Sequence, residues 1–239
     1  MTVAAVIVAA GHGSRLGEVG ALRPKALLEV DGRTLLELAL TTMRAVHAVT
    51  EFVVVHPPGR EDSFREVVGD QVRLVRGGPT RAASVRAGVG AVGSSAEAVA
   101  IHDAARPLVP PVVMARVIDA LAGKVIAAAP GLPVADTLKR VRPDGDVLGT
   151  VGRGGLWAVH TPQVVRRDVL EATLEWADGR DTTDDLALVE EARAAGAVLG
   201  RIVLVRGDPR DLKITFPEDL ALVATIVRGS RPTAFGTTR

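Results

Sequence analysis

The stretch V-A-A-V-I-V-A-A at residues 3–10, followed by G-H-G-S-R-L-G at residues 11–17, decides the fold class. Eight apolar residues in a row are typical of a strand that is buried on both faces of a parallel sheet. The glycine-bearing loop after them predicts a sharp turn at the carboxyl end of that strand, where α/β proteins bind their ligands. The chain therefore opens with a central strand and a candidate binding loop.

The rest of the chain alternates short apolar runs with segments of helical periodicity. We expect further strands at residues 51–56, 72–75, 98–101, 124–129 and 201–205. We expect helices at residues 34–46, 80–92 and 111–122. This alternation predicts an α/β fold with a doubly wound, mostly parallel sheet and a binding site at the carboxyl ends of its strands.

Composition excludes several classes of protein. The chain has 239 residues and no cysteine, so we expect neither disulfides nor a cysteine-ligated metal site. A formal net charge of +1 argues against nucleic-acid binding, which needs a surplus of Lys and Arg. We expect no membrane anchor and a cytoplasmic location, because no signal peptide and no apolar run of about 20 residues is evident. With 3% aromatic residues and no Tyr, a bound nucleobase is not expected to stack on a ring.

Residues 133–151 break the alternation with two β-like pieces around Pro143, Asp144 and Gly145, which is the pattern of a hairpin. We expect a projecting arm at about residues 133–152 that is covered by a partner subunit, giving a homodimer. The alternative is a hairpin that folds back on its own domain. No linker divides the chain, so we expect one domain at residues 1–228 and a disordered tail at residues 229–239.

The loop after the first strand is a candidate phosphate site. Its glycine spacing, GxGxxxG, fits neither the dinucleotide fingerprint nor the GxxxxGK phosphate loop. Gly11 and Gly13 let the backbone approach a ligand, and Arg15 and Lys25 add two cations near the same strand end. The alternative is a tight turn with a structural role only. The two cations favour a site for a triphosphate.

A second candidate group follows the strand expected at residues 98–101. Asp103 comes directly after it, where a carboxylate can hold Mg²⁺ on nucleotide phosphates. Arg106 can face the same cleft. The alternatives for Asp103 are a helix cap or a salt bridge to Arg106. We interpret His102 as a packed residue, because no nucleophile accompanies it.

Further polar residues become candidates only in this company, namely Thr137, Arg153, Thr161 and Lys213. The acidic cluster at residues 181–185 is interpreted first as a helix cap and second as a contact to another ligand.

Taken together, these motifs resemble the 2-C-methyl-D-erythritol 4-phosphate cytidylyltransferases of the non-mevalonate isoprenoid pathway. The resemblance runs from about residue 3 to residue 227 and consists of nine motifs in family order. They are A-A-G-x-G-x-R (9–15), P-K (24–25), G-G-x-x-R-x-x-S-V (77–85), H-D-A-A-R-P (102–107), P-V-x-D-T-x-K (133–139), R-x-x-L-W (153–157), T-P-Q (161–163), T-D-D (183–185) and K-I-T-x-P-E-D-L (213–220).

The resemblance implies a Rossmann-like nucleotidyltransferase that joins CTP to methylerythritol phosphate and releases pyrophosphate. It implies that Arg15 and Lys25 stabilise charge on the α-phosphate and the leaving pyrophosphate, and that Asp103 coordinates Mg²⁺. The implied nucleotide site consists of Ala9, Ala10, Gly11, Gly13, Gly78, Ser84 and Ala104. For the second substrate, the implied phosphate ligands are Arg153 and Lys213, and the implied polyol contacts are Arg106, Thr137 and Thr161, with Asp103 also at this substrate. Thr137 and Lys139 are implied to complete the partner subunit's site.

Several positions depart from the family pattern. The loop between Arg15 and Lys25 is longer, and the other departures are Ala26, Pro79, Thr80, Gly152 and Leu186. Because these positions lie in substrate-side loops, a cytidylyltransferase for another polyol phosphate, such as ribitol phosphate, remains an alternative. Two further alternatives are a guanylyltransferase of the molybdenum-cofactor type, suggested by P-K-A-L-L at residues 24–28, and a non-catalytic nucleotide-binding module.

Overall fold

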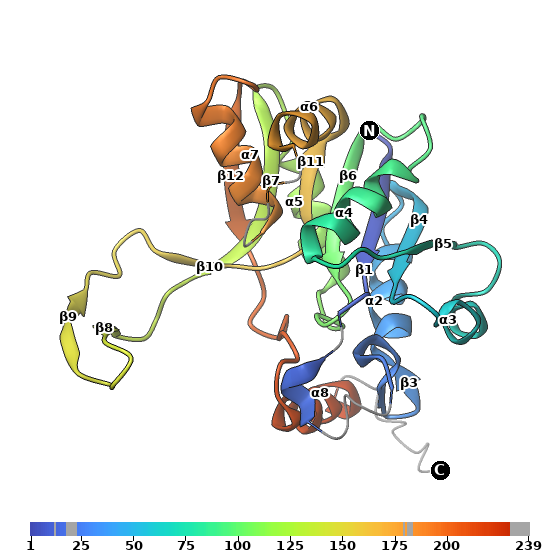
Figure 1. Ribbon diagram of the computed structural model, residues 1–239, viewed down its shortest axis with the longest axis horizontal. Coiled ribbons are helices and arrows are strands. Elements are labelled where there is room, and N and C mark those ends of the chain that lie inside the picture. Colours follow the sequence, from blue (N-terminus) through green and yellow to red (C-terminus); the bar gives the residue numbers. More distant parts are fainter. Residues whose placement is uncertain (12, 18–22, 179, 181–183, 230–239) are drawn as a thin grey trace, which may run out of the picture.

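The computed structural model describes residues 1–11, 13–17, 23–178, 180 and 184–229, and its centre is an eight-stranded mixed sheet (Figure 1). The strand order is β10-β7-β11-β6-β1-β4-β5, and β12 also pairs with β7. The strands are β1 (Val3–Val8), β4 (Val49–His56), β5 (Arg73–Arg76), β6 (Ala98–Asp103), β7 (Val125–Pro133), β10 (Trp157–Val159), β11 (Gln163–Arg166) and β12 (Arg201–Arg206). Every strand expected from an apolar run is therefore present.

The direction of the strands makes the sheet mostly parallel, as the alternation predicted. β1 runs parallel to both β4 and β6, β4 to β5, and β7 to β12. The antiparallel members are β11, between β6 and β7, and β10 at the far end of β7. Because the chain moves outward from β1 in one direction through β4 and β5 and then returns to β6 on the other side, the strand order reverses between β1 and β6. Ligands bind at such a reversal in open α/β sheets.

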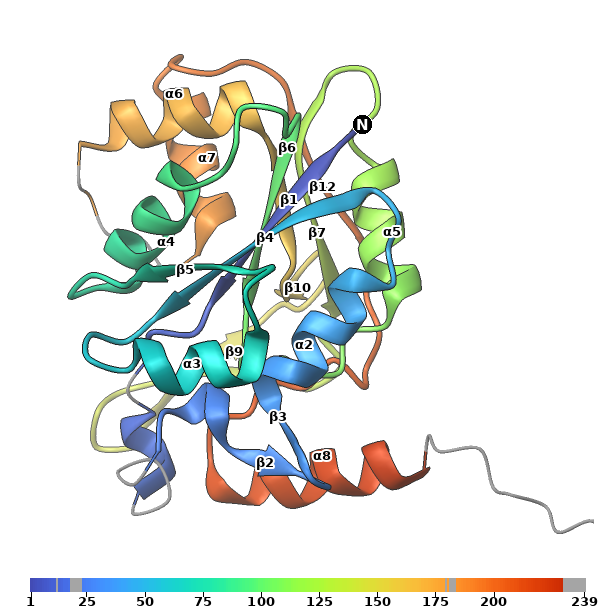
Figure 2. The same cartoon turned by 90° about the vertical axis from the view of Figure 1, so that its right-hand side faces the viewer.

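Helices cover both faces of the sheet (Figure 2). One face carries α2 (Leu35–Arg44), α3 (Glu61–Val68) and α5 (Pro111–Asp119), and the other carries α4 (Arg81–Gly90), α6 (Arg167–Ala177) and α7 (Asp185–Ala194). α8 (Pro217–Gly229) packs beside a small hairpin of β2 (Glu29–Val30) and β3 (Arg33–Thr34). Among the described residues, no helix has the length and apolar composition needed to cross a membrane.

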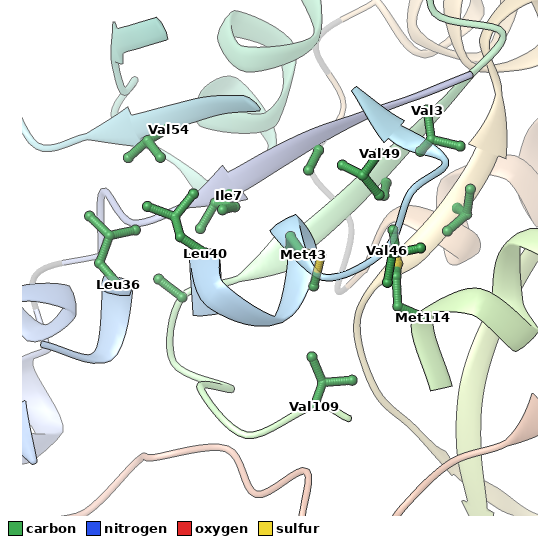
Figure 3. Close-up of a cluster of buried hydrophobic side chains, with 14 of the residues drawn as sticks. Val3, Ile7, Leu36, Leu40, Met43, Val46, Val49, Val54, Val109 and Met114 are labelled. Carbon is green, nitrogen blue, oxygen red and sulfur yellow. The ribbon is translucent and has the colours of Figure 1, made fainter. Parts of the chain in front are cut away.

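Alternate residues of β1 supply the two halves of the core. Val3 and Ile7 pack against α2 and α5 (Figure 3), whereas Ala4 and Val6 face the helices on the opposite side. Nearly all the large side chains in these clusters are aliphatic, in keeping with the 3% aromatic content of the chain, and Phe64 is the fully buried ring of the first cluster. An uninterrupted apolar run is needed at β1 because neither of its faces meets solvent.

The hairpin expected at about residues 133–152 forms and projects from the body of the molecule (Figure 1). β8 (Leu138–Val141) pairs antiparallel with β9 (Val147–Val151), and Val141, Val147 and Leu148 are each about half exposed. The alternative, in which the hairpin folds back on its own domain, is wrong for this chain. We call residues 133–156 the arm.

The expected start of the tail needs a small correction. α8 continues through Gly229, because its apolar face still packs through Val223 and Val227 onto the cluster around Leu35 and Ile214. The remaining tail, residues 230–239, lies outside the described residues.

Candidate active site

A pocket of about 320 Å³ lies where the carboxyl ends of β1 and β6 meet. Val8 and Asp103, the last residues of these strands, are register partners. The pocket is lined by Val8, Ala9, Ala10, Gly11, Gly13, Arg15, Lys25, Ala26, Gly78, Pro79, Thr80, Arg81, Ser84, Asp103, Ala104, Ala105, Lys213 and Thr215. Its volume suits a small-molecule ligand. The first loop, the residues after β6 and the Lys213 segment, which are far apart in sequence, therefore share one cavity.

The first loop is built to bring backbone close to a ligand. Gly13 has φ 64°, which places it in the left-handed region, and a Cβ there would lie 3.1 Å from Cβ of Lys25. After it, a 3₁₀ turn at Ser14–Leu16 buries Leu16 in the cluster beneath α8. Leu16 therefore anchors the loop, while Arg15 is exposed and lines the pocket.

A second turn lies opposite, between β5 and α4. The Gly78 N–H donates to Oγ of Ser84 at 3.1 Å, and the Ser84 hydroxyl donates to the Thr80 carbonyl oxygen at 2.9 Å. Thr80 caps α4 by accepting from the Ala83 N–H. A Cβ on Gly78 would lie 2.5 Å from Cβ of Ala83, so glycine is required for this close approach. Ser84 thus holds the turn at the rim of the pocket.

Asp103 is the one carboxylate among the described residues that line the pocket, and both of its oxygens are paired. Lys213 Nζ donates to Oδ2 at 2.6 Å, and Arg81 donates to Oδ1 from Nε at 3.3 Å and from NH2 at 3.1 Å. Burial alone would raise the pKa of Asp103, but Arg81 and Lys213 outweigh it and lower the pKa to about 2. Asp103 is therefore ionised at neutral pH, which a cation ligand requires.

Lys25 is a pocket cation whose pKa is lowered. Its Nζ donates to the Ile214 carbonyl oxygen. Burial, followed by repulsion from Lys213 and Arg15, lowers the pKa of Lys25 from 10.5 to about 8. Lys213 and Arg15 thus lie close enough to repel Lys25, and an anionic ligand relieves that repulsion.

Arg81 is a pocket residue that the candidate set from the sequence missed. Besides holding Asp103, it forms a two-pronged ion pair with Asp185, from NH1 to Oδ1 at 3.0 Å and from NH2 to Oδ2 at 2.8 Å. The sequence carried a signal for it, the arginine of G-G-x-x-R directly after the helix-capping Thr80. Nothing in the sequence indicated that its partner would be Asp185, 104 residues away.

The acidic cluster at residues 181–185 divides into two roles where it is described. Asp184 caps α7 by accepting from the Ala187 N–H at 2.7 Å, as the capping interpretation predicted. Asp185 pairs with Arg81 instead. Residues 181–183 lie outside the described residues.

Arg106 does not face the pocket, contrary to expectation. It is nearly buried, donates to the Asp211 carbonyl oxygen at 2.9 Å and lies 3.8 Å from Oδ2 of Asp211. The buried Asp211 carboxylate attracts the guanidinium to the far side of the turn after β6. The suggested salt bridge between Asp103 and Arg106 is also wrong, because Arg81 and Lys213 occupy Asp103.

His102 and Thr161 form a buried support behind the pocket. His102 bonds through Nε2 to the Arg106 carbonyl oxygen at 3.0 Å and through Nδ1 to the Thr161 hydroxyl at 2.9 Å. Thr161 Oγ1 accepts from the Asp103 N–H at 3.1 Å. Burial lowers the pKa of His102, which keeps it neutral. His102 is thus a packed residue, as interpreted from the sequence, and Thr161 touches the backbone of Asp103 rather than lining the pocket.

The remaining candidates lie on the arm and do not line the pocket. Lys139 donates to the Thr150 hydroxyl at 2.6 Å across the hairpin, and Arg153 donates to the Ala135 carbonyl oxygen. Thr137, Lys139 and Arg153 are all exposed. Within one chain, the pocket therefore brings together Arg15, Lys25, Asp103 and Lys213 and all the residues expected at the nucleotide. The three arm residues lie outside it.

Among the described residues, the pocket offers one carboxylate to a divalent cation, so a bound substrate would have to supply the other ligands. No group of three His, Cys, Asp or Glu side chains within the described part of the chain is placed to hold a metal by itself. Asp103 offers a single ionised carboxylate, which matches the usual way Mg²⁺ is bound, through one or two carboxylates plus substrate phosphates and water. The residues present thus fit a cation that arrives with a polyphosphate.

Comparison with known proteins supports one family. The family model described as 2-C-methyl-D-erythritol 4-phosphate cytidylyltransferase matches residues 3–229. A protein of that name from Rhodococcus opacus is 42% identical over 226 residues, covering 94% of this chain and 95% of its own length. Another from Frankia casuarinae is 37% identical over 234 residues, covering 96% and 83%. The crystal structure of the Thermus thermophilus protein of the same name superposes with a TM-score of 0.76 at 34% identity, covering 95% of this chain and 100% of that one.

Proposed function

The chain belongs to the 2-C-methyl-D-erythritol 4-phosphate cytidylyltransferase family, and from this premise we propose how its residues carry out the reaction. A member of this family is a nucleotidyltransferase of isoprenoid precursor biosynthesis. For this chain, the substrates are CTP and 2-C-methyl-D-erythritol 4-phosphate, and the products are 4-diphosphocytidyl-2-C-methyl-D-erythritol and pyrophosphate.

The observation that carries the proposal is the charge pattern of the pocket. Arg15, Lys25 and Lys213 line one cavity at the strand reversal, together with a single ionised carboxylate. Burial, and after it repulsion from Lys213 and Arg15, lowers the pKa of Lys25, and a neutral ligand would leave that repulsion in place. A triphosphate removes it, because its charge is opposite and concentrated.

In the proposed reaction, an oxygen of the polyol phosphate attacks the α-phosphorus of CTP in line. A new P–O bond forms as the bond from the α-phosphorus to the bridging oxygen breaks, and the electron pair leaves with pyrophosphate. No general base is needed, because the attacking oxygen is already anionic at pH 7. Catalysis then consists of placing two anions together and neutralising the charge that develops.

We assign Arg15 and Lys25 to the α-phosphate and the leaving pyrophosphate, and Lys213 to the phosphate of the second substrate. Backbone groups of Ala9, Ala10, Gly11 and Gly13, and of Gly78, Ser84 and Ala104 on the facing side, are assigned to the nucleoside. All seven line the pocket, and no aromatic side chain does among the described residues. Cytosine is therefore read by backbone hydrogen bonds and not by stacking.

Asp103 would hold Mg²⁺ in this proposal. The cation supplies charge neutralisation at the triphosphate, and Asp103 provides the protein ligand for it. Arg81, His102 and Thr161 surround Asp103 and fix its side chain and its backbone.

We propose that a second copy of the chain covers the arm, and that Thr137, Lys139 and Arg153 reach the pocket of that copy. The exposed apolar side chains of Val141, Val147 and Leu148 support this proposal, since an arm with nothing packed on it gains little from them. Arg106 lies away from the pocket, so its contact with the polyol is not retained in the proposal. A cytoplasmic location and a single domain at residues 1–228 stay predictions from the sequence.

The reaction is tested by measuring pyrophosphate release with Mg²⁺ across a panel of substrates. We expect release from CTP with methylerythritol phosphate, and neither from CTP alone nor from UTP or GTP. Equal turnover with ribitol phosphate would contradict the assigned polyol. CTP binding without any turnover across the panel would favour a nucleotide-binding module.

A further inference from the structure

Arg81 stands between two carboxylates that are both nearly buried. Its guanidinium donates two hydrogen bonds to the Asp185 carboxylate, at 3.0 and 2.8 Å. It donates two more to Oδ1 of Asp103, at 3.3 and 3.1 Å. Exposed fractions of the side chains are 8% for Asp185, 12% for Asp103 and 29% for Arg81. Four of its five N–H groups are thus directed at carboxylates, which leaves little capacity for a substrate.

We propose that Arg81 is a positioning residue that fixes the orientation of the Asp103 carboxylate for a divalent cation, with Asp185 as its anchor. This inference rests on the proposed function, because it concerns the cation that accompanies CTP. Arg81 acts through Asp103 and needs no contact with the reacting atoms.

The anchor is rigid because the start of α7 is tied to the same sheet that carries Asp103. Gln163, on β11, accepts with its Oε1 from the N–H groups of Asp185 and Leu186, at 2.9 and 2.8 Å. β11 pairs with β6, and Gln163 is the register partner of Ile101, two residues before Asp103. A continuous series of hydrogen bonds therefore links β6 to Gln163 and Asp185, and then through Arg81 back to Asp103 at the end of β6.

The two cations on Asp103 are not equivalent. Arg81 is held by Asp185, whereas Lys213 is 43% exposed and makes a single bond to Oδ2. A guanidinium fork keeps its geometry, while an ammonium on a flexible stem is a movable point charge. If Asp103 held a divalent cation, Lys213 would therefore be the partner that gives way, and Arg81 the one that stays. Lys213 would then be free to meet a phosphate.

The test must separate orientation from charge. Removing Arg81 alone takes away a positive charge beside Asp103 and leaves Asp185 as a buried, unpaired carboxylate, which costs stability. The double variant Arg81→Met with Asp185→Asn removes one charge of each sign, so the net charge is unchanged. Arg86→Met is the matched control, because Arg86 lies on the same helix and donates to the Leu174 carbonyl oxygen away from Asp103.

CTP binding is measured by calorimetry at increasing Mg²⁺ concentration, without the polyol phosphate, and melting temperatures are recorded in parallel. We expect Arg81→Met to lower the melting temperature, and the double variant to recover most of that loss. The double variant should still need about tenfold more Mg²⁺ for half-maximal CTP binding, which is the usual effect of losing a residue that orients a metal ligand. Arg86→Met should match the parent.

A double variant with a Mg²⁺ requirement within twofold of the parent would overturn the inference, since the pair would then serve stability alone. CTP binding by the parent that is independent of Mg²⁺ would also overturn it. Failure of the proposed function looks different: the parent would bind Mg²⁺ and CTP but release no pyrophosphate, and the comparison of variants by calorimetry would still decide the role of Arg81.

Discussion

The pocket and the arm differ in how their charged residues are satisfied. At the pocket, Asp103 is buried and paired with Arg81 and Lys213, all within one chain. On the arm, Arg153 and Lys139 are exposed and bond only to neighbouring parts of the arm. Both regions carry motifs of the same family, yet one is assembled by the fold and the other extends away from it.

The difference teaches which part of the site a single chain can build. Strand ends, helix starts and buried ion pairs position the nucleotide pocket, since they are fixed by the sheet. The arm has no such support, and its apolar residues Val147 and Leu148 face outward. In the proposed function, its residues act where the surface of a second copy of the chain meets them.

The largest effect is expected from Lys25→Met, which removes a cation from the fixed region. A group that meets developing charge is worth at least about 100-fold in kcat, so turnover should fall by that much or more. Steady-state pyrophosphate release measures it, with Lys124→Met, an exposed lysine before β7, as the control. If kcat stayed within twofold of the parent value, Lys25 would have no role in catalysis.

A somewhat smaller and more selective effect is expected from Arg153→Ala on the arm. Losing one charged hydrogen bond should lower kcat/KM for the polyol phosphate by about 10- to 100-fold, while calorimetric affinity for CTP stays unchanged. Arg142→Ala serves as the control, because Arg142 lies on the same arm and pairs with Asp146. Weaker CTP binding by Arg153→Ala would place this residue at the nucleotide. It would contradict the assignment of the arm to the polyol phosphate alone.

A third prediction concerns pH. Because the pKa of Lys25 is lowered to about 8 in the free enzyme, the ammonium loses its proton as the pH rises through 8. kcat/KM, which reports on the free enzyme, should therefore fall tenfold per pH unit, or about that, above this value. Lys25→Arg should lack this limb, since arginine stays protonated. The same limb in both proteins would assign it to another group.

The smallest effect on folding is expected at the tip of the arm. Val147→Ser with Leu148→Ser exchanges exposed side chains, so the unfolding free energy of the monomer should change by about 0.5 kcal/mol or less. The same variant should weaken self-association, which sedimentation at several protein concentrations detects. An unchanged association constant would show that the tip of the arm is not part of the dimer interface.

Much of the fold followed from the sequence because its signals are local. The apolar run at residues 3–10 predicted β1, and the helical periodicity at residues 34–46 and 80–92 predicted α2 and α4, each to within about two residues at either end. The pocket candidates followed as well, since strand ends of a parallel sheet meet at one edge. The pairing of Arg81 with Asp103 and Asp185 did not follow, because these residues are 22 and 104 positions away from Arg81 in the sequence and meet only in the folded chain. Arg106 was misplaced for the same reason: its turn toward Asp211 depends on a contact 105 residues away.

The most direct test of this account combines one defect from each region. Lys25→Met and Arg153→Ala chains are co-expressed with different tags, and doubly tagged dimers are assayed for pyrophosphate release. If the arm of one chain serves the pocket of the other, each mixed dimer has one intact site and one doubly defective site. The purified mixed dimers should then regain about half of the parent activity per dimer, as the symmetry of a two-fold assembly requires. Activity no higher than the residual level of either variant would contradict the account, because pocket and arm would then act within a single chain.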